Sequence, residues 1–204
     1  MLNIIAVCTG NICRSPLAEH LLTARLADLD VRVFSAGTRA RSGMGVTTET
    51  AQIALAYGGS PHEIADHRAR FLTEDLLQSA DLALAMAREH RRQIVEMTPS
   101  FSRKTFTVRE LARLVSGIPD AELLSAADGD SESSDPTERL AAMLRVVAGR
   151  RGTLAPAGAE DDDVIDPYRR SSRTYEVSAS QLTAALPPVE RLVRLSFPQR
   201  DRQF

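Results

Sequence analysis

The chain of 204 residues is long enough to form one domain with a sizeable hydrophobic core. Its formal net charge of -2 excludes the strong basic field that recruits nucleic acid or an acidic membrane surface. Hydrophobic residues make up 43% of the chain and charged residues 25%, and no segment approaches transmembrane length. We therefore expect a soluble protein with no nucleic-acid partner and no membrane partner.

Strand-like apolar runs alternate with helical periodicity along the whole chain. The expected strands are 4–8, 31–35, 82–86 and 105–107. The expected helices are 15–27, 46–57, one that opens at Thr73, 89–97, 108–115, 137–147 and 175–195. This alternation is typical of an α/β fold, in which helices cover both faces of a parallel sheet.

Two later segments have the composition of loops. Residues 125–135 are rich in serine and acidic residues, and we expect a solvated, mobile loop there. A second loop is expected over 152–163, and Pro187-Pro188 should break or kink the final helix. We expect residues 1–197 to form a single domain and residues 198–204 to be a frayed tail.

The two cysteines of the chain, Cys8 and Cys13, lie close together near its start. They exclude a long-range disulfide framework, and the N-terminal residues lack the basic segment of an export signal. We therefore expect a cytoplasmic protein, since a reducing compartment keeps thiols in their reactive form.

The most informative segment joins the first strand to the first helix, and it reads Val7-Cys-Thr-Gly-Asn-Ile-Cys-Arg-Ser-Pro16. A loop in this position points backbone N–H groups inward, and the helix N-terminus adds partial positive charge. That geometry holds a phosphate-like dianion and favours the nucleophilic thiolate form of a cysteine. The spacing of Cys8 and Arg14 therefore predicts phosphoryl transfer through Cys8, with the Arg14 guanidinium holding two phosphoryl oxygens.

This motif resembles that of the low-molecular-weight protein tyrosine phosphatases, and Asp166-Pro167-Tyr168 gives a second match far downstream. The resemblance covers residues 3–115 and 163–195. It implies a three-layer α/β sandwich with a four-stranded parallel sheet and a phosphate-binding loop after the first strand. It implies a cytoplasmic hydrolase that needs no metal or other cofactor and that removes phosphate from phosphotyrosine in proteins. A bacterial tyrosine kinase is then a candidate partner, and we expect a monomer.

The resemblance also assigns roles to individual residues. Asp166 would be the general acid that protonates the leaving phenolate oxygen. Its neighbours Asp161, Asp162 and Asp163 are competitors for this role, and we expect their replacement to change little. An ordinary turn-forming Asp-Pro pair is the alternative interpretation of residues 166–167.

Loop residues would bind the phosphoryl group or support the loop. The resemblance assigns substrate binding to Thr9, Gly10, Asn11, Ile12, Cys13 and Ser15, and assigns bracing of Asn11 to Ser35 and His67. A helix N-cap remains the alternative for Ser15, and a partly buried structural histidine remains the alternative for His67.

The walls of the substrate pocket depart from the family pattern. Tyr168 would form one wall of a slot for a flat phenol ring. The family commonly places an aromatic residue in the loop after the second strand, whereas residues 38–45 contain none. Arg169 and Arg170 follow Tyr168, and an arginine-flanked mouth would favour acidic phosphopeptides, although a solvated charge pair is the alternative.

Two other functions remain open on these residues. One is an arsenate reductase that uses a small thiol, which would share this loop and fold; the other is a non-catalytic anion-binding module. Asp166-Pro167 favours a phosphate-ester leaving group over the first, and the combination of Cys8, Arg14 and Asp166 disfavours the second. We also expect Cys13 to form a reversible disulfide that protects Cys8 from over-oxidation, with a small packing residue as the alternative.

Overall fold

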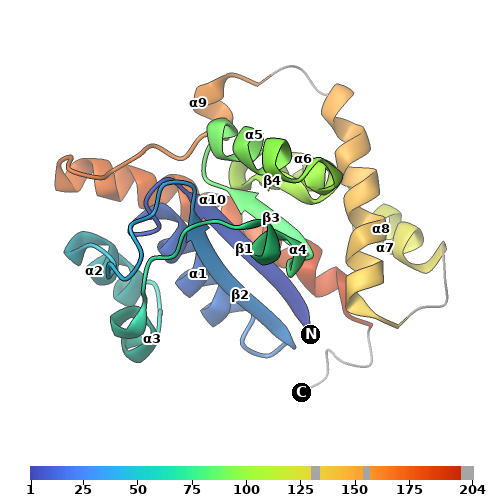
Figure 1. Cartoon of the computed structure of the whole chain (residues 1–204). Coiled ribbons are helices and arrows are strands. Elements are labelled where there is room, and N and C mark those ends of the chain that lie inside the picture. Colours follow the sequence, from blue (N-terminus) through green and yellow to red (C-terminus); the bar gives the residue numbers. More distant parts are fainter. Residues whose placement is uncertain (130–133, 154–156, 199–204) are drawn as a thin grey trace.

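The computed structural model describes residues 1–129, 134–153 and 157–198. Its centre is a parallel four-stranded sheet in the order β2-β1-β3-β4. The strands are β1 (Leu2–Cys8), β2 (Val31–Gly37), β3 (Leu82–Ala85) and β4 (Thr105–Thr107). Because the strands are parallel, their carboxyl ends lie at one edge of the sheet, where folds of this type bind ligands (Figure 1).

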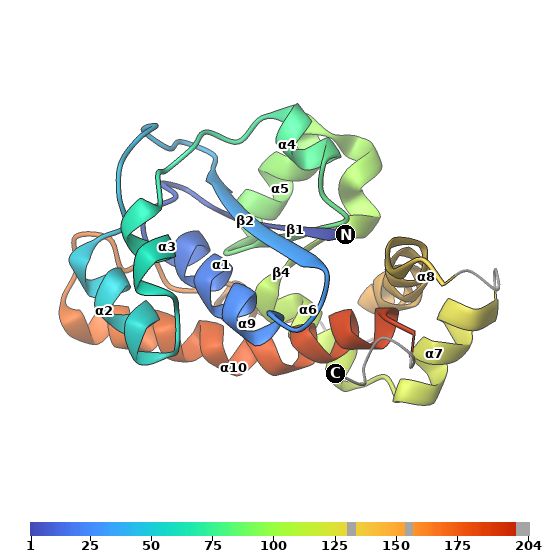
Figure 2. The same ribbon diagram turned by 90° about the horizontal axis from the view of Figure 1, so that it is seen from below.

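Helices cover both faces of this sheet (Figure 2). One face packs against α1 (Arg14–Arg25), α6 (Val108–Ser116) and α10 (Ser172–Ser196), and the other against α4 (Glu74–Gln78) and α5 (Arg88–Met97). The other helices are α2 (Thr48–Ala56), α3 (Pro61–Asp66), α7 (Asp120–Gly129), α8 (Pro136–Gly149) and α9 (Ala159–Asp162), with 3-10 turns at Pro99–Lys104 and Arg150–Gly152. The three-layer α/β architecture predicted from the sequence is confirmed.

The central strand β1 is apolar on both sides, as a strand between two helical layers must be. Ile4 and Ala6 belong to the core beneath α1 and α10, whereas Ile5 and Val7 belong to the core beneath α4 and α5. All four side chains are 0% exposed. This burial fixes the register of β1, so the position of Cys8 at its carboxyl end is fixed too.

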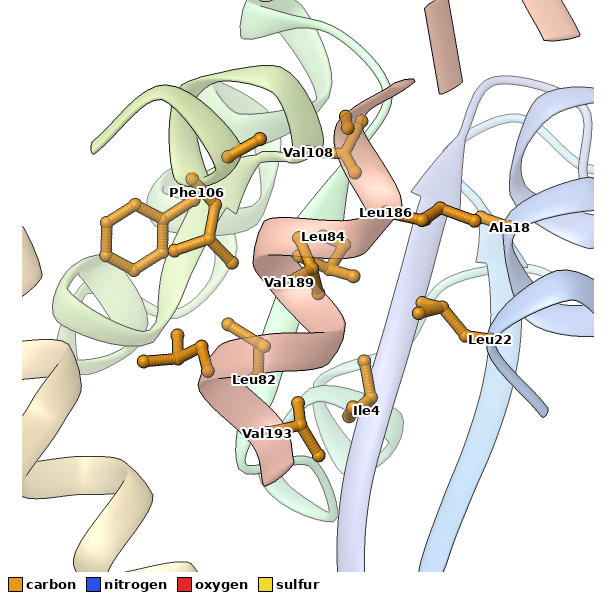
Figure 3. Close-up of a cluster of buried hydrophobic side chains, with 14 of the residues drawn as sticks. Ile4, Ala18, Leu22, Leu82, Leu84, Phe106, Val108, Leu186, Val189 and Val193 are labelled. Carbon is orange, nitrogen blue, oxygen red and sulfur yellow. The ribbon is translucent and has the colours of Figure 1, made fainter. Parts of the chain in front are cut away.

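The sequence predicts that Pro187 and Pro188 break or kink the final helix; α10 continues through both residues, so the prediction of a break is wrong and the prediction of a kink stays a prediction. A proline inside a helix removes a hydrogen bond and costs about 3 kcal/mol. Leu186, Val189 and Val193 are each 0% exposed in the core beneath the sheet (Figure 3). Burying each such side chain contributes about 1.5–3 kcal/mol, so the three together contribute a stabilisation comparable with the cost of the two prolines.

The predicted loop over 125–135 is also partly wrong, because residues 125–129 are helical in α7. Leu123 and Ala127, four residues apart, are buried together in the main core, and this contact extends the helix into the polar segment. Residues 130–133 of that predicted loop and residues 199–204 of the predicted tail lie outside the described residues. The predicted loop over 152–163 contains the short helix α9.

Candidate active site

Cys8 ends β1, and its sulfur is surrounded by hydrogen-bond donors. The side chain is 2% exposed. Its Sγ lies 3.0 Å from Oγ of Ser15 and accepts a hydrogen bond from the backbone N–H of Asn11 at 3.3 Å. Helix α1 begins at Arg14, so the positive end of its dipole lies beside the β1–α1 loop, residues 9–13. These donors together stabilise a negatively charged sulfur.

Ser15 does not cap α1, so the N-cap interpretation of this serine is wrong. Cys13 occupies the N-cap position, and Ser15 lies inside the first turn. Besides its contact with Cys8, the Ser15 hydroxyl accepts from Nδ2 of Asn11 at 3.0 Å and lies 3.4 Å from the Ala36 carbonyl oxygen, which competes with the Cys8 sulfur for the single hydroxyl proton. The hydroxyl therefore joins the sulfur to the supporting network beneath the loop.

Asn11 determines the shape of the β1–α1 loop. Its φ of 55° lies in the left-handed region, which asparagine tolerates better than most residues. Its Nδ2 also donates to Oγ of Ser35 at 2.6 Å, and its Oδ1 accepts from the backbone N–H of Arg70 at 2.9 Å. The side chain is fully buried, so these bonds tie the loop to β2 and to the segment after α3.

A second layer supports Asn11. Nε2 of His67 lies 2.9 Å from the Asn11 carbonyl oxygen, and the Ser35 hydroxyl donates to the carboxylate of Glu19. Oε2 of Glu19 lies 3.8 Å from Nδ1 of His67, and burial raises the pKa of Glu19. Sequence reasoning missed Glu19. Its position one helical turn after Ser15 is the signal that would have found it.

Two further buried histidines contact the loop or the His67 ring that supports it, and sequence reasoning missed both. The His20 ring packs edge-on against His67 with centroids 5.9 Å apart, and burial, reinforced by His67, lowers the pKa of His20 to about 4. On the other side, Nε2 of His90 in α5 lies 2.9 Å from Oγ1 of Thr9. Burial and the nearby Arg14 charge lower the pKa of His90 to about 4. Both rings are therefore neutral near pH 7.

Arg14 joins the β1–α1 loop to the distant Asp-Pro segment. The side chain is 6% exposed. Its Nη1 donates to the Val164 carbonyl at 3.0 Å, and its Nη2 donates to Oδ2 of Asp166 at 2.8 Å. The structure therefore brings together Arg14 and Asp166, which lie 152 residues apart in the sequence.

The turn after Asp166 presents Tyr168 at the surface. Oδ1 of Asp166 accepts from the backbone N–H of Tyr168 at 3.1 Å, which is the hydrogen bond of an Asx turn. Arg169 has a φ of 60° and places its guanidinium 5.2 Å from the centre of the Tyr168 ring. Tyr168 is 42% exposed, so its ring is accessible to a ligand.

A cavity of about 340 Å³ lies between these segments. Its walls combine apolar side chains, from Ile12, Met44 and Tyr168, with guanidinium groups. The guanidinium groups belong to Arg14, Arg39, Arg41 and Arg169. Of the residues predicted from the sequence, the cavity brings together Cys8, Thr9, Gly10, Ile12, Cys13, Arg14, Asp166 and Tyr168. Of the others, Asn11 is a buried residue of the loop itself, and Ser15, Ser35 and His67 are buried next to the loop and support it.

Cys13 has different surroundings from Cys8. Its Sγ lies 3.7 Å from Oγ1 of Thr47 and 3.8 Å from the Tyr175 hydroxyl. Burial raises the pKa of the Cys13 thiol, which favours its neutral form. Both cysteines are free thiols in the structure, and a bridge between Cys8 and Cys13 stays a prediction.

Gly37, the last residue of β2, lets the β1–α1 loop pack directly against the sheet. A Cβ atom at this position would lie 2.6 Å from the Thr9 carbonyl oxygen and 2.9 Å from the Asn11 nitrogen. No side chain fits in that space without moving the loop backbone. The close approach therefore depends on glycine at position 37.

Comparisons with known proteins agree with this geometry. Residues 3–147 match the family model of the low molecular weight phosphotyrosine protein phosphatases. A protein-arginine-phosphatase of Bacillus subtilis is 42% identical over 111 residues, which are 53% of this chain and 71% of that protein. The low molecular weight protein-tyrosine-phosphatase Etp of Escherichia coli is 39% identical over 103 residues, 50% of this chain and 66% of Etp.

A solved structure supports the same assignment. The low molecular weight protein tyrosine phosphatase from T. tengcongensis superposes with a TM-score of 0.63 at 28% identity, covering 93% of this chain and 97% of that chain. The chain therefore belongs to the low-molecular-weight phosphotyrosine protein phosphatase family, and it is an enzyme of the protein phosphatase class. Among the described residues, no helix is long and apolar enough to span a membrane.

Proposed function

We propose that this enzyme hydrolyses phosphotyrosine in proteins through a cysteinyl-phosphate intermediate. The observation that carries the proposal is the convergence of Cys8, Arg14 and Asp166 on one cavity. A nucleophile, an oxyanion-binding guanidinium and a carboxylic acid are the three groups that phosphoryl transfer through cysteine needs. The proposal also includes a reducing cytoplasmic location, which suits the two free thiols, and a monomeric enzyme that opposes a tyrosine kinase.

Substrate binding frees the general acid. Nη2 of Arg14 holds Asp166, and a phosphoryl dianion bound in the loop competes for the same guanidinium. The dianion takes the place of the carboxylate on Arg14, and the released Asp166 carboxylate takes up a proton from solvent before it turns toward the leaving-group oxygen. Since Nη1 of Arg14 still donates to the Val164 carbonyl, the guanidinium keeps its orientation during this exchange.

In the first chemical step the Cys8 thiolate attacks phosphorus. The S–P bond forms, the P–O bond to tyrosine breaks, and Asp166 gives its proton to the leaving oxygen. In the second step water attacks phosphorus, and the Asp166 carboxylate takes a proton from that water. The S–P bond then breaks with release of inorganic phosphate. The Ser15 hydroxyl, 3.0 Å from Sγ, stabilises the departing thiolate.

The cavity walls favour phosphotyrosine over phosphoarginine, the substrate named for the Bacillus subtilis relative. Ile12, Met44 and Tyr168 offer apolar contacts to a phenyl ring. Arg39 and Arg41 stand exposed at the mouth, where they repel the guanidinium of phosphoarginine and attract acidic residues that flank the phosphorylated one. We propose phosphotyrosine in an acidic sequence context as the preferred substrate.

Competition between substrates tests this proposal. We expect kcat/KM to be highest for phosphotyrosine peptides with acidic flanks, lower for neutral flanks, and lowest for phosphoarginine peptides. Arg41→Gln should reduce the preference for acidic flanks, whereas Arg32→Gln, on the exposed start of β2, should leave it unchanged. Faster hydrolysis of phosphoarginine would show an arginine phosphatase instead. Arsenate reduction that depends on a small thiol, without phosphatase turnover, would show a reductase.

Removal of the acid tests the mechanism. Asp166→Ala should slow hydrolysis of phosphotyrosine or phenyl phosphate by roughly 100- to 10,000-fold, the usual contribution of general acid catalysis. Esters with activated leaving groups need less protonation and should lose less rate. Equal losses for both classes of ester would assign Asp166 a purely structural role.

A further inference from the structure

The segment immediately before the Asp166 loop (residues 164–170) is held by three arginines from two helices. Arg88 is the first residue of α5, and Arg109 and Arg113 lie on α6. We call these three residues the arginine clamp. Each donates hydrogen bonds to the segment that contains α9 and Asp163.

Asp162 is the centre of the clamp. Its carboxylate is among the buried charged groups, at 5% exposure. Nε and Nη2 of Arg88 donate to Oδ2 at 3.0 and 2.6 Å, and Nη2 of Arg113 donates to Oδ1 at 3.0 Å. Two arginines therefore hold both oxygens of one carboxylate, four residues before Asp166. By contrast, the exposed Asp161 carboxylate accepts a local backbone bond, from Gly158 at 2.9 Å.

The chain remains tethered between Asp162 and Asp166. The Arg88 backbone N–H donates to Oδ1 of Asp163 at 2.7 Å, and Nη1 of Arg109 donates to the Asp163 carbonyl at 2.7 Å. The Val164 N–H donates to the Met86 carbonyl at 2.8 Å, while its own carbonyl accepts from Arg14. Asp166 follows two residues later with a side chain that is 50% exposed. The positions that the Asp166 carboxylate can occupy are therefore set by the anchored residues before it.

Because Asp162 lies among positively charged side chains, its negative charge is needed to keep the arginine clamp together. Arg91, Arg92 and Arg151 line the same groove as Arg88 and Arg113, together with Glu110. Burial, reinforced by the charge of Arg151, lowers the pKa of Arg91. Without a negative charge at residue 162, Arg88 and Arg113 would face each other in an already positive groove and would repel. The clamp would then release the segment that leads to Asp166.

We propose that Asp162, through Arg88 and Arg113, is a positioning residue that sets the distance between Asp166 and the leaving-group oxygen. This inference rests on the proposed role of Asp166 as general acid. A shift of about 1 Å in a reacting group lowers rates on the order of 100-fold. Loss of the clamp should therefore reduce proton donation while the nucleophilic attack of Cys8 continues.

The test uses the full chain and two esters, phenyl phosphate and the activated 2,4-dinitrophenyl phosphate. Asp162→Asn removes the charge at nearly constant volume, and Asp161→Asn is the matched control on the same turn. The sequence alone predicts little change on replacing Asp162, but its two arginine partners reverse that expectation. We expect Asp162→Asn to lower kcat for phenyl phosphate roughly 10- to 100-fold and to leave kcat for the activated ester within about threefold, since that ester needs little protonation. Asp161→Asn should match the parent enzyme on both.

Conservative variants separate positioning from general damage. Asp162→Glu keeps the charge and should recover part of the rate for phenyl phosphate, and Arg113→Gln, which removes one arm of the clamp, should show the same leaving-group dependence in weaker form. If Asp162→Asn does not fold, Arg113→Gln carries the test. Equal losses on both esters, or no loss, would overturn the positioning role.

The Asp166→Ala variant keeps the two proposals distinguishable. If Asp166→Ala shows leaving-group dependence and the clamp variants do not, only the positioning role fails. If Asp166→Ala itself shows none, the general-acid role fails, and the positioning role falls with it.

Discussion

The two sides of the active site are built from different interactions. On the nucleophile side, the β1–α1 loop rests on the fully buried, uncharged side chains of Asn11, Ser15 and Ser35. On the acid side, Asp166 is half-exposed, and the segment before it is held by ion pairs of arginine with aspartate. Neutral buried hydrogen bonds give a rigid anion cradle, whereas ion pairs between the buried Asp162 carboxylate and the partly exposed Arg88 and Arg113 hold the segment that leads to Asp166. Salt should therefore weaken the acid side more than the nucleophile side.

The largest expected effect is the loss of the nucleophile. Cys8→Ser should lower turnover of 4-nitrophenyl phosphate by more than roughly 10⁴-fold, because a serine hydroxyl is not ionised near neutral pH. The change is close to isosteric, so the thermal midpoint and phosphate binding should persist. A variant with substantial turnover would show that the reactive group lies elsewhere.

The second-largest loss of activity is expected at Arg14, whose guanidinium joins the β1–α1 loop to the segment that carries Asp166. Arg14→Lys keeps the charge but cannot bond the Val164 carbonyl and a phosphoryl group with one planar fork. We expect kcat to fall by roughly 10²- to 10³-fold, as for the loss of an oxyanion donor. Arg25→Lys, at the other end of α1, is the control and should keep normal kcat. Near-normal kcat in Arg14→Lys would contradict its role as a clamp on the transferred group.

The rigidity of the nucleophile side is tested at Asn11. Asn11→Ala removes three side-chain hydrogen bonds and adds left-handed strain, whereas Asn11→Gly removes the bonds alone. Leaving buried partners unsatisfied costs about 1–3 kcal/mol each, and the strain in alanine adds about 1–2 kcal/mol. Denaturant unfolding should rank the parent above Asn11→Gly and Asn11→Ala last. Equal stability of the two variants would mean that the backbone conformation carries no strain.

The smallest effect concerns pH. His20 stays neutral in the folded protein because its pKa is lowered to about 4, but in the unfolded chain it binds a proton below about pH 6.5. The unfolding free energy should therefore fall as the pH drops from about 6.5 toward 4, by up to about 1.4 kcal/mol per pH unit from this residue. His20→Leu should flatten this slope. A slope in His20→Leu identical to that of the parent protein would show that His20 does not cause this pH dependence.

The sequence predicts the local half of this site well. Residues 8–15 are contiguous, so the cradle, the sulfur and the guanidinium follow from one strand–loop–helix motif. The supports come from elsewhere: His90 reaches Thr9 from α5, and the Val164 carbonyl reaches Arg14 across 150 residues. Such contacts depend on how helices pack against the sheet, which no local pattern encodes.

Tertiary packing also explains two further differences between the sequence predictions and the structure. Tertiary burial carries α10 through Pro187 and Pro188, and it extends α7 to Gly129 in a segment whose composition favours a loop. Asp161, Asp162 and Asp163 look equivalent as a run of three carboxylates. Only packing against α5 and α6 distinguishes Asp162 from the exposed Asp161.

The close approach at Gly37 has a consequence for the tolerance of this chain to change. Every substitution there places an atom against the backbone of the β1–α1 loop. A library that randomises residue 37 under selection for turnover should therefore return glycine alone. Gly45, which has open space around its α-carbon and no positive φ, should accept many residue types in the same library. The last residue of β2 should therefore tolerate no substitution, although no atom of Gly37 takes part in the proposed chemistry.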